Sequence, residues 1–289
     1  MPELPEVETI KLFLEKNIVG LKTSSVEILN TKSFLGDPKL IENKEITSVE
    51  RRAKILRIGF DDFELLIHLK MSGQLVLRNG SSIRNHEDFV GGHPTLDMFG
   101  ELPNKSTRVI FNLSDGAILY FNDQRKFGWI KLVTSDKLVD EKFISSLGPE
   151  PLEKGFSWEI LKQNLSRRKK TAVKVALLDQ ELVAGIGNIY ACEACFLAGI
   201  DPRKPVAELA DEDYRRLHKA IIESLENGIK YGGSSKTHFA NPEGKKGVFL
   251  DYAFVYGRDK LPCKKCGSLI SKVKLGGRGT FFCPQCQVD

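Results

Sequence analysis

Two Cys-x-x-Cys pairs decide how the C-terminal part of the chain folds: Cys263-Lys-Lys-Cys266 and, after sixteen intervening residues, Cys283-Pro-Gln-Cys286. Two such pairs at this separation present four thiolates to one tetrahedral Zn²⁺. A glycine-rich run at 276–279 lies between two short β-like stretches, so we expect a β-hairpin that the metal closes. Because four cysteines leave no open position for a catalytic water, we expect one structural zinc ion.

Positive charge is gathered in two patches. Residues 258–289 carry seven Lys and Arg against two Asp, an excess as large as the +5 net charge of the whole chain. The second patch has no acid between positions 160 and 178, and it consists of Lys162, Arg167, Arg168, Lys169, Lys170 and Lys174. Such patches on an otherwise balanced chain indicate an anionic polymer as partner. A solvated lysine-rich face is the alternative, and for either patch alone the sequence leaves both open.

The composition is typical of a globular protein with two packed domains. The chain has 289 residues, of which 41% are hydrophobic and 28% are charged. No run approaches the ~18 apolar residues of a membrane span, and the acidic, proline-containing start is unlike a signal peptide. We therefore expect a cytosolic protein, in which six cysteines indicate metal ligands or free thiols rather than disulfides.

The first half of the chain has the pattern of a β-sandwich or barrel with a helix in front. Within residues 2–16, apolar side chains recur at helical spacing. From 18 to 133 the sequence consists of short β-branched and aromatic runs broken by Gly, Asp and Asn. The clearest are 108–113 and 118–121, and the Ser-Asp-Gly between them predicts a hairpin turn.

The second half is helical. It follows a turn-rich segment with Leu-Gly-Pro-Glu-Pro at 147–151, which is a candidate interdomain hinge. Periodicity predicts helices at 158–165, 171–182, 188–198 and 208–231, and the polar, glycine-rich residues 232–247 predict a mobile loop. We divide the chain into an N-terminal domain at 1–134, a linker at 135–154, a helical domain at 155–257 and a zinc finger at 258–289.

Two motifs in the helical half carry weaker signals. Gly185-Ile-Gly-Asn-Ile-Tyr190 joins two predicted helices through a glycine turn, and N–H groups at such a helix start can bind a phosphate. Glycines also serve plain helix–helix turns, so this signal gains weight only beside the basic residues at 167–174. Cys192-Glu-Ala-Cys195 has no second pair, and we interpret both cysteines as packing residues.

The start of the chain, Pro2-Glu-Leu-Pro-Glu6, has two interpretations. Prolines in the first turn and acids near the positive end of the dipole are typical of a plain helix start. Alternatively, removal of Met1 exposes a secondary amine beside two carboxylates, and desolvation together with the helix end favours its unprotonated form. Such an amine can attack a sugar carbon and form an iminium ion, whereas with Met1 in place the nitrogen is an unreactive tertiary amide. The pattern alone leaves both interpretations open.

Together these motifs resemble the formamidopyrimidine-DNA glycosylase family, bacterial repair enzymes that excise oxidised purines. The resemblance covers nearly the whole chain in seven motifs that follow in the family's order. They are Pro2-Glu-Leu-Pro-Glu-Val-Glu-Thr9, Arg51-Arg-Ala-Lys54, His68-Leu-Lys-Met-Ser-Gly73, Asp123-Gln-Arg-Lys-Phe-Gly128, Gly185–Tyr190, Val255-Tyr-Gly-Arg258 and the four-cysteine finger. The resemblance implies an α+β multidomain fold: an N-terminal β-sandwich with a leading helix, then a helical domain with a helix-two-turn-helix and a β-hairpin zinc finger.

The resemblance also implies catalytic roles. Pro2 would be the Schiff-base nucleophile, Glu3 the general acid/base that assists sugar-ring opening, and Glu6 a supporting carboxylate. Lys54, on a β-strand, would contact phosphate and assist β-elimination. Arg278, at the tip of the finger's hairpin, would hold phosphates beside the lesion and assist the second elimination.

Further residues would contact the flipped-out base or the gap that it leaves. Met71, Arg125 and Phe127 match the family's triad that fills this gap, a usual way to offset unstacking. Without the resemblance, Met71 and Phe127 would be interpreted as core residues. Lys174 and the loop at 234–247 match regions that close over the flipped base.

Phosphate contacts, which position the duplex but read no sequence, form the last group. By resemblance they would come from His68, Lys169, Asn188 and Arg258. The family usually has a histidine shortly before the strand that begins near Val109, and this chain has none there. We expect Arg108 to make that phosphate contact instead.

The sequence therefore predicts a bifunctional DNA glycosylase/AP lyase that acts as a monomer in the bacterial cytosol, associated with the nucleoid. It would excise 8-oxoguanine or formamidopyrimidines from duplex DNA, bind abasic sites and cleave the strand by β,δ-elimination. One alternative is an endonuclease VIII-like glycosylase for oxidised pyrimidines. Its members usually lack the Leu-Pro-Glu-Val-Glu sequence that this chain has at 4–8. Another is a non-catalytic, zinc-dependent DNA-binding damage sensor, against which the presence of Pro2, Glu3 and Lys54 argues.

Overall fold

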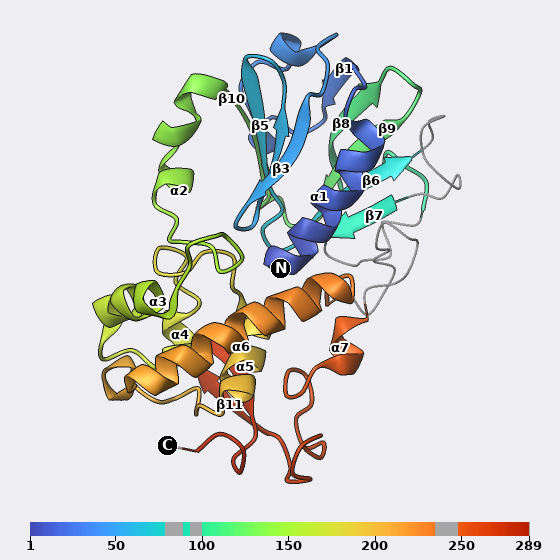
Figure 1. Ribbon diagram of the computed structural model, residues 1–289. Coiled ribbons are helices and arrows are strands. Elements are labelled where there is room, and N and C mark those ends of the chain that lie inside the picture. Colours follow the sequence, from blue (N-terminus) through green and yellow to red (C-terminus); the bar gives the residue numbers. More distant parts are fainter. Residues whose placement is uncertain (79–88, 93–99, 235–247, 289) are drawn as a thin grey trace. The chain divides into compact units, whose positions relative to one another are not determined.

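The computed structural model describes residues 1–78, 89–92, 100–234 and 248–288, and the chain forms two compact units (Figure 1). The first unit comprises Met1–Ser145 and Tyr231–Gly247, and the second comprises Ser146–Lys230 and Val248–Asp289. Among the described residues, no helix combines the length and the apolar character that crossing a membrane requires.

The first unit is a sandwich of two five-stranded sheets, as predicted. One sheet has the order β1 (Thr23–Ile28), β8 (Thr107–Leu113), β9 (Ile118–Asp123), β6 (Gly73–Arg78), β7 (Phe89–Gly92). The other has the order β2 (Phe34–Leu35), β10 (Trp129–Thr134), β5 (Phe63–His68), β4 (Ile55–Gly59), β3 (Ser48–Arg52). Apolar side chains from both sheets form one buried core.

The hairpin of β8 and β9 shows why this sequence forms a sandwich. Val109 and Phe111 point into the shared core, whereas Ile110 between them joins a smaller apolar cluster on the other face of its sheet, as the two-residue period of a strand requires. In the turn, Asp115 Oδ1 accepts a hydrogen bond of 2.9 Å from the Ala117 N–H, and Gly116 has a φ of +87°. The predicted turn is confirmed.

Helix α1 (Leu4–Ile18) contacts β3 and β7, which are edge strands of the two sheets (Figure 1). Val7, Ile10 and Leu14 bury their side chains in the sandwich core. The helix begins two residues later than predicted because Glu3 takes the N-cap position. The described residues of this unit also form short helices: η1 (Thr31–Ser33), η2 (Pro38–Ile41), η5 (Ser135–Asp140) and α2 (Lys142–Ser145).

Three longer helices of the second unit confirm the predicted helical half. They are α3 (Trp158–Leu165), α5 (Asn188–Ala198) and α6 (Asp211–Lys230). Helices α5 and α6 pack closely because Gly228 leaves room for Tyr190, whose ring would lie 2.5 Å from a Cβ at that position. The shorter elements are η6 (Ser166–Arg168), α4 (Val173–Ala176), η7 (Val206–Glu208) and α7 (Phe249–Tyr252).

The helix predicted at 171–182 is wrong, because only the four residues of α4 are helical there. Polar side chains close two turns in place of further helix. Asp179 Oδ1 accepts from the Glu181 N–H at 3.1 Å, and Gln180 Oε1 accepts from the Gly185 N–H at 2.9 Å. Such side-chain bonds compete with the helical ladder. The candidate hinge is bound to these turns, since the Gly148 N–H donates to Gln180 O at 2.8 Å, and hinge motion stays a prediction.

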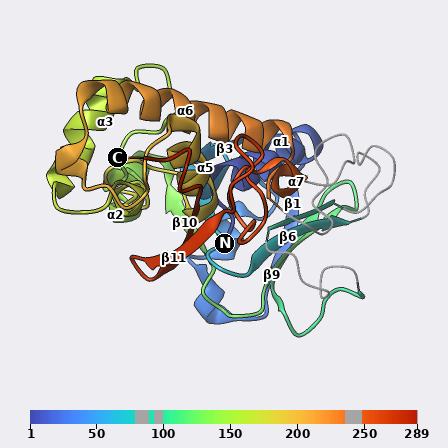
Figure 2. The same cartoon turned by 90° about the horizontal axis from the view of Figure 1, so that it is seen from below.

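The C-terminal finger is the predicted β-hairpin. Strands β11 (Ser271–Leu275) and β12 (Arg278–Phe282) pair antiparallel, with Leu275 opposite Arg278 and a turn at 276–277 between them. The hairpin packs against α5 of the same unit (Figure 2). Its position on α5 decides which residues of the finger reach the surface.

Candidate active site

The N-terminus of α1 brings Pro2 together with two carboxylates. Pro2, Glu3 and Glu6 are all buried. Glu6 Oε2 accepts a hydrogen bond of 2.8 Å from the Glu3 N–H, an arrangement that is typical of capping boxes. The predicted nucleophile therefore lies at the positive end of a helix dipole, directly before a carboxylate that the helix start holds in place.

The other carboxylate oxygen of Glu6 binds a distant segment of the same unit. Glu6 Oε1 accepts a hydrogen bond of 2.8 Å from the Ser234 N–H. This approach needs Gly233, which has a φ of +86° and whose added Cβ would lie 3.0 Å from Glu6 Cγ. Glu6 thus links the helix start to the first residues of the predicted mobile loop. Residues 235–247 of that loop lie outside the described residues, so its closure over a base stays a prediction.

Lys54 lies in a tight turn, and the prediction that it is on a strand is wrong. Arg52 on β3 pairs with Ile55 on β4, which leaves only Ala53 and Lys54 to reverse the chain. Ala53 takes a φ of +53°, a left-handed value typical of such turns. Lys54 is nevertheless buried, with 6% of its surface exposed.

His68, at the end of β5, is a neutral side chain in this environment. Burial, followed by the nearby charges of Lys70 and Lys54, lowers the pKa of its imidazole to about 3. Its Nδ1 accepts a hydrogen bond of 3.0 Å from the Lys70 N–H. The neutral ring therefore carries its proton on Nε2, and a phosphate would meet a neutral donor rather than a cation.

The three predicted gap-filling residues lie on two neighbouring loops. Met71 is in the β5–β6 loop, and Arg125 and Phe127 are in the β9–β10 loop, which lies beside it because Gly73 on β6 pairs with Asp123 on β9. Phe127 is 54% exposed, which contradicts its interpretation as a core residue. The Arg125 guanidinium carbon lies 4.9 Å from the centre of the Phe127 ring. The loops thus present an exposed aromatic and cationic pair.

Arg108 is buried, and its guanidinium binds two backbone carbonyls. Its Nε donates to Asp123 O, at the end of β9, at 2.8 Å, and its Nη1 donates to Lys105 O, before β8, at 2.9 Å. Burial lowers its pKa, although the Asp123 charge opposes this. In this structure Arg108 thus supports the neighbouring backbone from inside, and its contact with a phosphate stays a prediction.

Buried Lys174 and half-buried Asn188 form a link to the finger. Lys174 Nζ donates to Asn188 Oδ1 at 2.5 Å, and Asn188 Nδ2 donates to Gly279 O, next to Arg278, at 2.9 Å. Lys174 is fully buried, so a contact with DNA would require this part of the unit to open. The expectation that Lys174 meets the flipped base stays a prediction.

The remaining predicted phosphate contacts lie at the surface of the second unit. Lys169 follows η6 and is exposed, and Arg278 begins β12 at the hairpin tip, where it is exposed as predicted. Arg258 is partly exposed, and its Nη2 donates to Pro262 O at 2.7 Å. These three cations can reach an anion without rearrangement of the core.

The four finger cysteines fit one zinc ion. Their Sγ atoms all lie within 4.8 Å of one another, with 3.9 Å between Cys263 and Cys286 and 3.5 Å between Cys266 and Cys283. Tetrahedral zinc with bonds of ~2.3 Å places sulfurs ~3.8 Å apart. Hydrogen bonds from Ser268 lower the pKa of Cys266 to about 6, whereas burial and the other thiols raise the pKa of Cys286 to about 12. A divalent cation is what lets all four thiols ionise together.

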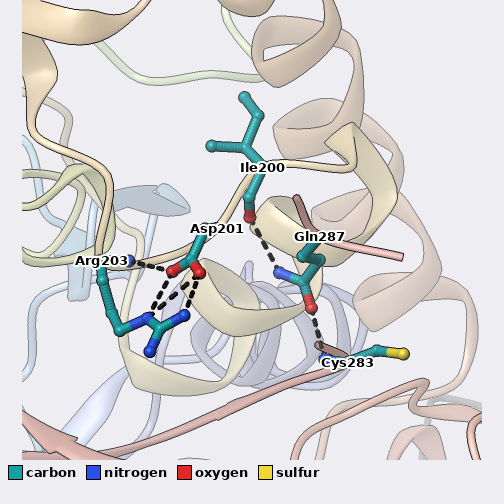
Figure 3. Close-up of polar contacts among 5 residues, drawn as sticks. All are labelled: Ile200, Asp201, Arg203, Cys283 and Gln287. Carbon is teal, nitrogen blue, oxygen red and sulfur yellow. Dashed lines mark hydrogen bonds and ion pairs between the residues drawn. The ribbon is translucent and has the colours of Figure 1, made fainter. Parts of the chain in front are cut away.

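Polar contacts near the metal site attach the finger to the end of α5 (Figure 3). Gln287 Nε2 donates to Ile200 O at 2.9 Å, and its Oε1 accepts from the Cys283 N–H at 2.8 Å. Beside it, Asp201 Oδ1 accepts from the backbone N–H and from Nε of Arg203 at 2.8 and 2.9 Å. The second cysteine pair is therefore fixed to the helical part by contacts other than the metal.

Sequence reasoning missed one buried acid in the Cys192–Cys195 motif. Both cysteines are buried and pack as predicted, and burial raises the pKa of the Cys195 thiol. Glu193 between them is also buried, and it accepts hydrogen bonds of 2.8 to 3.0 Å from the three N–H groups of residues 254–256. Burial raises the pKa of its carboxyl, although these bonds oppose the shift. A single charged residue in the apolar run 189–198 was the available signal.

Three protein-family profiles match successive parts of the chain. The Formamidopyrimidine-DNA glycosylase N-terminal domain matches residues 1–130, the Formamidopyrimidine-DNA glycosylase H2TH domain matches residues 147–240, and the Zinc finger found in FPG and IleRS matches residues 260–288. The expected sandwich, helix-two-turn-helix domain and finger are thus confirmed in that order.

Full-length relatives show the same similarity. The formamidopyrimidine-DNA glycosylase of Pelotomaculum thermopropionicum is 40% identical over 294 residues, and that of Bacillus subtilis is 38% identical over 293 residues, each alignment covering 99% of both chains. Among solved structures, Lactococcus lactis Fpg in complex with DNA that contains an abasic site has a TM-score of 0.85 at 36% identity, covering 99% of this chain and 100% of that one. A Lactococcus lactis Fpg mutant with Fapy-dG containing DNA gives 0.85 at 35% identity, covering 100% of both chains.

Proposed function

This chain belongs to the formamidopyrimidine-DNA glycosylase family, and from that premise we propose that it is a DNA repair glycosylase and AP lyase for oxidised purines in duplex DNA. The observation that carries the proposal is the buried start of α1, where Pro2 lies directly before Glu3 and Glu6. A plain helix start needs no such pair of buried carboxylates. The DNA in the Lactococcus lactis complexes, which contains an abasic site or a Fapy-dG lesion, supports a duplex substrate of this kind.

In the proposed reaction the Pro2 nitrogen is the nucleophile, once Met1 has been removed. Its lone pair forms a bond to the sugar C1′, and the bond between C1′ and the base breaks. The electron pair of that bond goes to the base, which also takes up the proton that the amine nitrogen gives up. The C1′–O4′ bond then opens to give an iminium ion, and Glu3 supplies the proton to O4′. The cationic nitrogen draws electrons toward C1′, so loss of protons from C2′ and then C4′ expels the 3′ and 5′ phosphates in turn.

The other residues would bind and orient the DNA. We propose that Met71, Arg125 and Phe127 fill the gap left by the everted base, and that Lys54 and Arg278 assist the two eliminations at the phosphates. Neutral His68 would donate a hydrogen bond, and further phosphate contacts would come from Lys169, Asn188 and Arg258. Zinc on the four finger cysteines would close the hairpin that carries Arg278 and would take no part in the chemistry.

The proposal extends to the setting of the enzyme. We propose that it acts as a monomer on nucleoid DNA in the bacterial cytosol, which is consistent with the bacterial relatives. The division into domains at 1–134, 155–257 and 258–289, with a linker at 135–154, is part of the same proposal.

Cleavage of three duplexes tests the function. We expect faster single-turnover excision from an 8-oxoguanine·cytosine duplex than from a thymine glycol·adenine duplex, with β,δ-elimination products. Glu3→Gln should slow excision strongly, whereas Glu15→Gln, a control at the exposed end of the same helix, should not. Preference for the pyrimidine lesion would favour the endonuclease VIII-like alternative. Tight binding without cleavage of either lesion or of an abasic duplex would favour the damage-sensor alternative.

A further inference from the structure

One buried carboxylate connects the two loops that carry the gap-filling residues. Asp123, the last residue of β9, is fully buried. Its Oδ1 accepts hydrogen bonds from the Ser72 hydroxyl at 2.5 Å and from the Arg125 N–H at 3.2 Å, and its Oδ2 accepts from the Gly128 N–H at 2.6 Å. Ser72 belongs to the β5–β6 loop, whereas Arg125 and Gly128 belong to the β9–β10 loop. The carboxylate thus spans both loops.

Ser72 completes the connection. Its Oγ donates to Asp123 and accepts from the Arg125 N–H at 3.1 Å, so the Arg125 N–H is shared between two acceptors, one from each loop. Gly128 is needed for this fit, because an added Cβ would lie 2.9 Å from Phe121 Cζ and 3.1 Å from Asp123 Oδ2. The bonds at the Arg125 and Gly128 N–H groups fix backbone at or directly beside a gap-filling residue.

The β9–β10 loop is exposed between its two anchored residues, Arg125 and Gly128. Residues 124–127 are exposed, and Lys126 takes a left-handed φ of +58°. Hydrogen bonds to an ionised acceptor are roughly twice as strong as neutral ones. An exposed loop that is anchored at both ends on a buried carboxylate can therefore keep one conformation while its side chains face solvent.

We propose that Asp123, together with Ser72, is a positioning residue that holds the Met71 loop and the Arg125–Phe127 loop in one arrangement for entry into the duplex. This inference rests on the proposed function. A side chain offsets the unstacking of a base only if it is already held in place when the base leaves the stack. Loosening the loops should therefore slow base eversion more than the elimination chemistry at a site that has already lost its base.

Two variants and one control test the proposal. Ser72→Ala removes the link between the loops and leaves the carboxylate in place. Asp123→Asn puts an NH₂ group in place of one acceptor oxygen, so either the Gly128 N–H or both the Ser72 hydroxyl and the Arg125 N–H lose that acceptor. The matched control is Asp115→Asn at the other end of β9, where the carboxylate caps the Ala117 N–H in a turn away from the gap-filling residues.

Single-turnover rates on two duplexes give the readout. Both variants should excise 8-oxoguanine about tenfold more slowly, as expected for a lost hydrogen bond to a charged group, and should cleave a preformed abasic site at a rate within about twofold of wild type. The fluorescence of 2-aminopurine beside the lesion should show slower gap filling by the same factor. Asp115→Asn should match wild type in all three measurements.

The outcomes separate this inference from the function on which it rests. An inactive wild type on both duplexes refutes the proposed function. An active wild type with variants that match it, or with variants that slow both reactions equally, overturns the positioning role alone. If Asp123→Asn melts at a much lower temperature than wild type, Ser72→Ala, which loses the two hydrogen bonds of one hydroxyl and keeps the buried carboxylate, decides between these outcomes.

Discussion

Replacing His68 by asparagine should make the protein more resistant to acid. Burial and the neighbouring Lys70 and Lys54 lower the pKa of His68 to about 3, and its Nδ1 already accepts the Lys70 N–H at 3.0 Å. An asparagine can offer its Oδ1 to the N–H two residues further on, as in an Asx turn. It keeps this hydrogen bond, but it cannot take up a proton.

The size of the effect follows from the two pKa values. The unfolded chain protonates His68 near pH 6.5, whereas the folded protein keeps it neutral down to about pH 3. Between these values the unfolded state binds more protons, so the free energy of unfolding falls as the pH falls, and the full stability is present only above about pH 6.5. Linkage gives a loss of ~2 kcal/mol at pH 5 and ~3 kcal/mol at pH 4, which the asparagine variant should not show.

Urea unfolding at about pH 7.5 and pH 5 measures this difference. Tryptophan fluorescence is a local probe, because the Trp129 ring centre lies 5.7 Å from that of His68. The free energy of unfolding of the variant, relative to wild type, should rise by ~2 kcal/mol between the two conditions. The reasoning is refuted if this difference is the same at both pH values, or if NMR shows His68 titrating near its unfolded pKa.

Three further perturbations test the helix packing, the buried acid and the metal site. Gly228→Ala should lower the melting temperature, because the new Cβ would lie 2.5 Å from the Tyr190 ring and overpacking costs ~1–3 kcal/mol; an unchanged melting temperature would contradict the packing. Glu193→Ala should lower the free energy of unfolding by ~3 kcal/mol or more, because the N–H groups of 254–256 lose their acceptor. Denaturant unfolding measures this change, and a decrease below ~1 kcal/mol would show that water replaces the carboxylate. Chelation of zinc, or Cys283→Ser, should unfold the hairpin and abolish duplex binding in a gel-shift assay, and binding that survives with zinc absent by metal analysis would exclude a structural metal.

Local patterns were enough to predict much of the fold. Helices α3 and α5 begin and end at the predicted residues, because their apolar period is uninterrupted and Ser157 and Gly199 mark one end of each. The helix at 171–182 failed because Asp179 and Gln180 bind backbone groups of the following turns. That competition depends on the course of the backbone after residue 180. A periodic sequence pattern carries no information about that course.

The site was harder to predict, because burial of a charged side chain depends on distant parts of the chain. Nothing near Lys174 in the sequence indicates that its ammonium group will donate a hydrogen bond to Asn188. Arg108 was likewise expected to take the role of a histidine that the family has near this position. In the structure its guanidinium donates a hydrogen bond to the carbonyl of Asp123. The N-terminal pattern left two interpretations open, and the resemblance to a family favoured the nucleophilic one. Its two carboxylates are buried beside Pro2.

Borohydride trapping on an 8-oxoguanine·cytosine duplex tests the central claim, imine chemistry at Pro2, most directly. The zinc-loaded protein, shown by mass to lack Met1, should form a covalent adduct with the DNA, and Pro2→Gly should weaken or abolish it. The absence of an adduct on this duplex, and also on an oxidised-pyrimidine and an abasic duplex, would contradict the account and favour a protein that binds damage without acting on it.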